Sequence, residues 1–125
     1  PEMSGRSLLP MLLGQAQPDW RNHILYEYHW EWNFPATPTT LAIRTDRYKL
    51  IRFPDTEVVE FYDLQEDPQE MYNRGSESDY QKQIATTQKQ LNTLMTEVGI
   101  TRDFLIKKMG DNSKLPPRIH KKRKK

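Results

Sequence analysis

A row of polar side chains within residues 26–35 is the part of the chain whose residue types are best suited to chemistry. Glu27, His29 and Glu31 follow one another at every second position, and Asn33 continues the row. In a β-strand such side chains share one face, with neighbours about 7 Å apart. Carboxylate, imidazole and carboxylate in this arrangement can bind a divalent metal or serve as an acid–base set. Mixed charges on a strand face are also common where the face is solvated or paired across strands, so the pattern alone does not establish a site.

The other candidates for catalysis are isolated in the sequence. His23 and His120 have no clustered partners, Ser7 has no nearby base, and there is no glycine-rich phosphate loop. The chain contains no cysteine, which excludes disulfides and a thiol nucleophile. We therefore expect no catalytic residue and no metal site within this chain.

The residues between the polar positions predict the strand that would carry them. Aromatic rings occupy every even position: Tyr26, Tyr28, Trp30, Trp32 and Phe34. Strict alternation of aromatic and polar residues is typical of a β-strand, and aromatic side chains bury large areas. We expect Tyr26 and Tyr28 to lie in the core, and Pro35 to end the strand because it cannot donate to a ladder.

Three further strands follow at short intervals, over residues 41–45, 48–53 and 58–64. Links this short join antiparallel neighbours, so the four strands predict an antiparallel meander. Apolar residues then recur at helical spacing over residues 80–98, and Gly99 is suited to end the helix. The sequence therefore predicts an α+β fold, in which one long C-terminal helix packs on a small four-stranded antiparallel sheet.

The segment between the last strand and the long helix carries a helix-start pattern. Residues 67–70 place aspartate at the N-cap and proline at the first helical position, with glutamate two residues later. Met71 and Tyr72 would then pack back on the sheet. Asn73 is suited to end this turn in a left-handed conformation.

The apolar start of the chain predicts a division into three parts. Around Leu8, Leu9 and Leu12, a short helix would be apolar nearly all round, and such a helix needs burial on several sides. We expect residues 1–19 to form this helix and a linker from a preceding domain. Residues 20–99 would form the sheet-plus-helix subdomain, and residues 100–125 a short helix and a disordered basic tail.

The charge distribution limits the classes of partner. Residues 114–125 carry seven basic side chains and no acidic one, so the rest of the chain is net acidic although the whole carries +2. An acidic body is not typical of a nucleic-acid-binding domain, and we expect no nucleic-acid partner. The tail is either solvated or attracted to a polyanion. No run of 18 apolar residues is present, so no membrane span is expected.

Five short blocks follow one another along the chain: Gly5-x-Ser7-Leu8-x-Pro10-x-Leu12, Trp20-Arg21, Tyr26-Glu27-Tyr28, residues 42–51, and Phe61-Tyr62-Asp63-Leu64-x-x-Asp67-Pro68-x-Glu70-x-x-Asn73. In this order they resemble the C-terminal region of type I sulfatases, members of the alkaline-phosphatase-like superfamily. Residues 27–35 resemble the corresponding element of bacterial sulfatases that act on glycans and of relatives of the N-acetylglucosamine-6-sulfatases. The resemblance covers about residues 3–98.

The resemblance implies that the chain is the C-terminal subdomain of a sulfuric ester hydrolase, docked on a larger α/β catalytic domain. In that family a formylglycine, made from the first residue of a Cys/Ser-x-Pro-x-Arg motif, is the nucleophile, and a calcium ion binds the sulfate. This chain contains neither the motif nor the calcium ligands, so calcium and formylglycine are implied for the intact enzyme alone. The family is mostly periplasmic, secreted or lysosomal, and the chain itself indicates no compartment.

The resemblance also implies a role in recognising a sulfated carbohydrate, because this subdomain closes one side of the substrate pocket in such enzymes. Sugar recognition needs hydrogen-bonding side chains beside an aromatic face. The candidate substrate-binding residues are His29, Trp30, Glu31, Trp32 and Asn33. Core and interdomain packing is the alternative role for this stretch. For the whole chain, the alternative is a stand-alone interaction module whose basic tail binds a polyanion.

Overall fold

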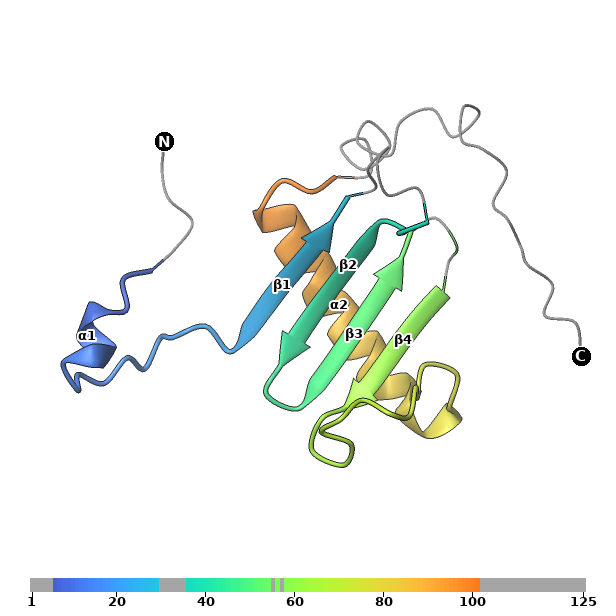
Figure 1. Ribbon diagram of the computed structural model, residues 1–125, viewed down its shortest axis with the longest axis horizontal. Coiled ribbons are helices and arrows are strands. Elements are labelled where there is room, and N and C mark those ends of the chain that lie inside the picture. The colour runs from blue at the N-terminus through green and yellow to red at the C-terminus, as the bar shows by residue number, and fades with distance from the viewer. Residues whose placement is uncertain (1–5, 30–35, 55, 57, 102–125) are drawn as a thin grey trace, which may run out of the picture.

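A computed structural model describes residues 6–29, 36–54, 56 and 58–101 (Figure 1). The elements are α1 (Leu9–Leu12), β1 (His23–Tyr28), β2 (Thr40–Thr45), β3 (Tyr48–Phe53), β4 (Val58–Asp63), a 3-10 turn η1 (Ser78–Tyr80) and α2 (Gln81–Glu97). The strands form one sheet in the order β1-β2-β3-β4, and each pairs with its neighbour antiparallel. Helix α2 crosses one face of this sheet (Figure 1). The predicted antiparallel meander and long C-terminal helix are confirmed.

The core lies between the sheet and α2. The strand register places one apolar residue of each strand in a row across the sheet: Leu25, Ile43, Leu50 and Phe61. Leu91 of α2 packs against this row and is fully buried. A second cluster, Leu41 with Ile100, continues the core toward the C-terminal end of the helix. Full burial of each such side chain contributes about 1.5–3 kcal/mol to stability.

The aromatic side of β1 faces away from this core, so the prediction that Tyr26 and Tyr28 lie there is wrong. Leu25 packs against the buried cluster, whereas Tyr26 is 56% exposed. Because successive side chains point to opposite faces, the tyrosines lie on the outer face of the sheet and Glu27 shares the helix side with Leu25. Opposite Tyr26 on β2 is Ala42, which is buried. The rings therefore cover the outer surface of the sheet.

The segment after β4 is a turn, and the helix start predicted there is wrong. The N–H of Glu70 donates to the carbonyl of Asp67 at 3.1 Å, and Glu70 has a φ of 57°, which stops any helix at that residue. The Asp67 carboxylate accepts from the N–H of Tyr72, five residues later, and so does not cap a first turn. Met71 and Tyr72 are 72% and 65% exposed, so they do not pack on the sheet as predicted. The left-handed residue is Glu70, and Asn73 does not adopt that conformation.

Helix α1 has the apolar surface that the sequence predicts, and none of its residues is buried. Leu12 is 80% exposed, and Leu8, Leu9, Met11 and Leu13 are also exposed. The helix lies apart from the sheet (Figure 1). Neither helix of the described part has the length and apolar character needed to cross a bilayer. The predicted division into residues 1–19, 20–99 and 100–125 stays a prediction, and the tail beyond residue 101 lies outside the described residues.

Candidate functional site

The candidate substrate-binding residues begin where β1 ends. The structure describes His29, and it places Nε2 of His29 3.4 Å from Oε2 of Glu27. Both ring nitrogens are shielded from solvent, although the side chain as a whole is only half-buried. Trp30, Glu31, Trp32 and Asn33 lie outside the described residues, so their predicted roles stay predictions. Of the polar row, the structure thus brings Glu27 and His29 together, as the alternation along the strand predicts.

The strand end that carries this pair is held in place by its surroundings. The ladder to β2 continues to the pair Tyr28–Thr40, and Thr39 beside it is fully buried. Leu41, which pairs with Glu27, packs against Ile100 just beyond α2. Since a functional group needs a rigid support to recognise a ligand, this fixed strand end is a suitable position for one.

The residues present do not fit the calcium ion and the formylglycine that the resemblance implies. The described residues contain no group of three or more His, Cys, Asp or Glu side chains that could hold a metal ion. Glu27 and His29 supply two ligands at most, and Glu31 is outside the described part of the chain. The 125-residue sequence has no Cys and no Ser in a Ser-x-Pro-x-Arg context. No catalytic step can therefore be derived from this chain.

A cluster of charges that the sequence did not reveal lies on the outer face of the sheet. The Glu70 carboxylate contacts Nζ of Lys49 at 2.5 Å and a guanidinium nitrogen of Arg44 at 3.7 Å. Beside it, the Tyr62 hydroxyl donates to Glu60 at 3.0 Å. Burial and this hydrogen bond raise the pKa of Tyr62 to about 12. The cluster fastens the turn after β4 to the sheet, and its groups are paired with one another.

A buried carboxylate fixes the turn between β2 and β3. Asp63 accepts from Nε and Nη2 of Arg47 at 3.1 and 2.9 Å, and from the N–H of Gln65 at 3.1 Å. Burial by itself raises the pKa of Asp63, but these hydrogen bonds outweigh it and hold the pKa below its usual range. The N–H of Leu64 also donates to the carbonyl of Arg47 at 2.7 Å. This arrangement joins the β2–β3 turn to the end of β4.

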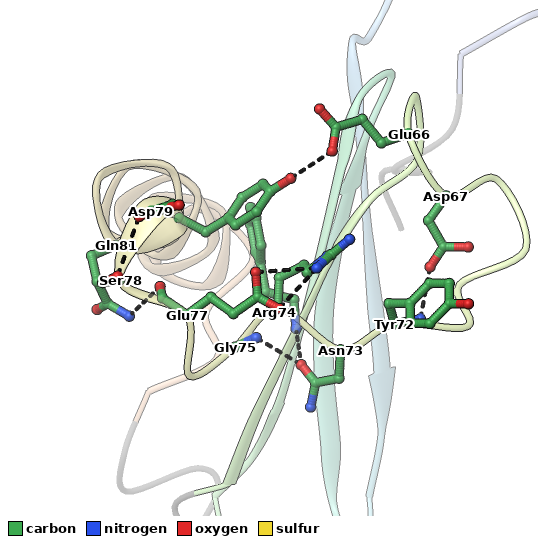
Figure 2. A network of polar contacts seen from close by, with 12 residues as sticks. Glu66, Asp67, Tyr72, Asn73, Arg74, Gly75, Glu77, Ser78, Asp79 and Gln81 are labelled. Atoms are coloured by element: carbon green, nitrogen blue, oxygen red, sulfur yellow. Dashed lines mark hydrogen bonds and ion pairs between the residues drawn. The ribbon is translucent and has the colours of Figure 1, made fainter.

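The connection from β4 to α2 is held by the polar network of Figure 2. Oδ1 of Asn73 accepts from the N–H of Phe61 at 3.0 Å and from the N–H of Gly75 at 2.8 Å. The Arg74 guanidinium pairs with the Glu77 carboxylate at 2.9 Å. These polar groups satisfy one another, so the network is structural. The sequence predicted that Asn73 would end a helical turn in a left-handed conformation; in the structure its side chain instead joins β4 to the turn at Gly75.

Comparison with known proteins assigns this fold to a family. The family model described as "N-sulphoglucosamine sulphohydrolase, C-terminal" matches residues 1–97. Two similar proteins come from Bacteroides thetaiotaomicron. A Delta 4,5-hexuronate-2-O-sulfatase is 30% identical over 95 residues, which is 76% of this chain and 20% of the relative. An N-acetylglucosamine-6-O-sulfatase is 35% identical over 102 residues, which is 77% of this chain and 17% of the relative.

A solved structure shows the same arrangement of elements. It is described as a complex with its substrate D-glucosamine-2-N,6-O-disulfate, and it superposes with a TM-score of 0.68 at 31% identity. The superposition covers 78% of this chain and 20% of that one. The chain thus spans about one fifth of the length of the relatives it matches. The chain therefore belongs to the N-sulphoglucosamine sulphohydrolase C-terminal family, the C-terminal domain of sulfatases in the alkaline-phosphatase-like superfamily.

Proposed function

We propose that this chain works as the C-terminal subdomain of a sulfuric ester hydrolase, where it forms one side of the substrate pocket while another domain performs the chemistry. The observation that carries the proposal is the Glu27–His29 pair on the fixed end of β1, within a chain of the sulfatase C-terminal family. The calcium ion and the formylglycine would belong to that other domain, because the residues here do not fit them.

The partner of this subdomain would be an N-terminal catalytic domain of the same enzyme. Exposed apolar side chains occur on two parts of the structure that such a domain could cover. One is α1, with Leu9 and Leu12 among its exposed residues. The other is the outer face of the sheet at β1, where Ile24 and Tyr26 are exposed. Contiguous exposed apolar surface in a soluble protein usually marks an interaction site, which supports a large neighbour on these faces.

The substrate would be a sulfated carbohydrate, recognised in part by residues His29 to Asn33. Support for the substrate class comes from the relatives, two of which are named as a hexuronate sulfatase and an N-acetylglucosamine sulfatase. A carboxylate and an imidazole can hydrogen-bond sugar hydroxyls, which for His29 requires its shielded ring nitrogens to be uncovered in the enzyme, and Trp30 and Trp32 would supply aromatic faces. A hydrogen bond to a charged partner contributes about 1.5–3 kcal/mol, which makes such contacts able to discriminate between sugars.

The test is the turnover of a full-length sulfatase whose C-terminal part is this chain, with His29→Ala and Glu31→Ala introduced separately. N-acetylglucosamine 6-sulfate is compared with the small ester 4-nitrophenyl sulfate. We expect kcat/KM for the sugar to fall at least about tenfold while hydrolysis of the aryl ester is unchanged, because the lost contacts reach the sugar only. Lys89→Ala, an exposed change on α2, is the matched control.

If each variant hydrolysed each substrate as fast as the wild type does, the recognition role would be contradicted. An equal loss on both substrates would assign His29 and Glu31 to packing between domains instead. The interaction-module alternative stays a prediction, and its basic tail lies outside the described residues. It requires that the chain alone be a stable monomer and that residues 114–125 bind a polyanion. Deleting residues 114–125 and titrating with salt would test the polyanion binding.

A further inference from the structure

A polar groove lies at the end of the sheet away from His29. It is bounded by the start of β1, the turn between β2 and β3, and the first half of α2, and its volume is about 530 Å³. A strand of six residues spans about 20 Å, so the groove is well separated from the end of β1 that carries His29. Its lining includes the side chains of Asn22, His23, Asp46, Arg47, Lys82 and Gln83.

One atom of this groove lacks the partner that its burial requires. Oε1 of Gln83 is shielded from solvent and has no hydrogen-bond partner among the described residues. A buried acceptor left unsatisfied costs about 1–3 kcal/mol, and native proteins contain few of them. Because Gln83 lines the groove, a rotation of its side-chain amide would bring this oxygen within reach of a hydrogen-bond donor supplied from the groove.

The same groove contains a positive charge that is already held in place. The guanidinium of Arg47 is bound to the buried Asp63 through Nε and Nη2, and it also lies 5.0 Å from the ring centroid of Tyr48. The bonds to Asp63 do not use Nη1, and half of the side chain is exposed. Lys82, exposed on α2, adds a second cation. A preorganised guanidinium binds an anion with little ordering cost.

The groove continues along the outer side of the sheet. A second hollow of about 400 Å³ shares Asn22, His23 and Asp46 with the first and extends to Trp20 and Arg21. The side chains of Asn22 and His23 contact each other at 2.6 Å between Oδ1 and Nδ1, which fixes the imidazole at the junction. The two hollows together could therefore accommodate a ligand longer than one sugar ring.

We propose that this groove is a second glycan subsite, which binds one sulfated sugar unit at the end of the sheet opposite His29. The cations Arg47 and Lys82 would bind the sulfate. The acceptors Gln83 Oε1 and the Asp46 carboxylate would bind sugar hydroxyls, which are donors that a bare sulfate ion lacks. The choice of a sulfated sugar rests on the proposed function, whereas the groove and its unsatisfied acceptor do not.

The test is a titration of the whole 125-residue chain followed by NMR of its side-chain amide and guanidinium groups. N-acetylglucosamine 6-sulfate is expected to shift the signals of Gln83 and of Arg47 Nε. Sodium sulfate should shift Arg47 but leave Gln83 unchanged, and N-acetylglucosamine should bind more weakly than its sulfate ester. Gln83→Leu should raise the Kd of the sugar sulfate about fivefold, as expected for one lost hydrogen bond.

Matched variants separate binding from folding. Lys82→Gln should weaken the sugar sulfate several-fold, whereas Lys89→Gln, on the same helix but outside the groove, should not. Without ligand, Gln83→Leu should be at least as stable as the wild type, because it removes an unsatisfied acceptor. The proposal would be overturned if Gln83→Leu were less stable than the wild type. It would also be overturned if neither Gln83→Leu nor Lys82→Gln changed the Kd of the sugar sulfate.

A further variant distinguishes this subsite from the one at the end of β1. His29→Ala should leave the groove titration unchanged. If His29→Ala abolished sugar binding and Gln83→Leu did not, the assignment of the groove as a subsite would be overturned and the site at His29 would be supported. No shift of Gln83 at tens of millimolar sugar sulfate would overturn the groove alone, because turnover of the full-length enzyme judges the site at His29 separately.

Discussion

Replacing Asn73 by alanine tests the network that joins β4 to α2. Asn73 Oδ1 accepts two hydrogen bonds, from the N–H groups of Phe61 and Gly75 (Figure 2). Phe61 is fully buried while this acceptor is in place, so removing the acceptor leaves the N–H of Phe61 poorly solvated. Gly75 is partly exposed, and its N–H can find a water molecule instead.

The cost of the change follows from these two environments. An orphaned buried donor costs about 1–3 kcal/mol, and a lost hydrogen bond at a more accessible site costs about 0.5–1.5 kcal/mol. We therefore expect Asn73→Ala to lower the free energy of unfolding by about 2–4 kcal/mol. In a unit of this size each kcal/mol lowers Tm by roughly 4–8 °C, so the loss is large enough to measure easily.

Urea unfolding followed by tryptophan fluorescence and circular dichroism gives the free energies. Asn73→Asp keeps the acceptor and should lose much less stability than Asn73→Ala. Asn92→Ala is the matched control, because Asn92 is exposed on α2 and its side-chain oxygen accepts from Gln88 and Arg52 at the surface. If the free energy of unfolding of Asn73→Ala lay within about 0.5 kcal/mol of that of Asn92→Ala, the structural role of Asn73 would be refuted.

Three further predictions concern the same unit. The pKa of Asp63 is lowered in the folded state, so its ionised form contributes stability above the unfolded pKa of about 4, and this stability is lost as pH falls through the folded pKa. Asp63→Asn should consequently be less stable at neutral pH and show a flatter acid limb in urea unfolding; parallel pH profiles would contradict this. Gly75→Ala should destabilise by about 1–3 kcal/mol, because its Cβ would lie 2.6 Å from the carbonyl oxygen of Val59, and an unchanged thermal midpoint would show that the turn can shift. Ultraviolet titration should find a phenol of pKa about 12 that is absent in Tyr62→Phe and titrates earlier in Glu60→Gln, whereas a Tyr62 signal unmoved by Glu60→Gln would contradict the assigned hydrogen bond.

The strands and the long helix could be predicted because their signals are local. The short links around Asp46-Arg47 permit only antiparallel neighbours, and β2 and β3 begin and end within one residue of the predicted bounds. The same holds at the end of α2, where Gly99 has a φ of 79°, a conformation that glycine adopts without strain.

The orientation of β1 could not be predicted, because alternation is the same on both faces of a strand. The pairing of Leu25 with Ile43 on β2 decides which face meets α2, and Tyr26 then lies outside. Similarly, the Asp-Pro pattern at residue 67 is consistent with a helix start locally. The ion pair between Glu70 and Lys49, 21 residues apart, belongs to a turn with different geometry. Such decisions depend on tertiary contacts that local patterns do not contain.

In the candidate site too, local patterns were predictable and tertiary contacts were not. Alternation correctly placed Glu27 beside His29, because side chains two apart on a strand are neighbours on one face. The groove around Gln83 had no signal in the sequence, since its side chains come from three segments that only the fold brings together.

The most direct test of the central claim is a crystal structure of a full-length sulfatase that contains this chain, with a sulfated glucosamine bound. We expect a side chain from residues 29–33 within about 2.7–3.2 Å of a sugar oxygen, and a catalytic domain that covers α1 and the outer face at Tyr26. A sugar bound without any contact to residues 29–33, with His29 packed against the catalytic domain, would contradict it.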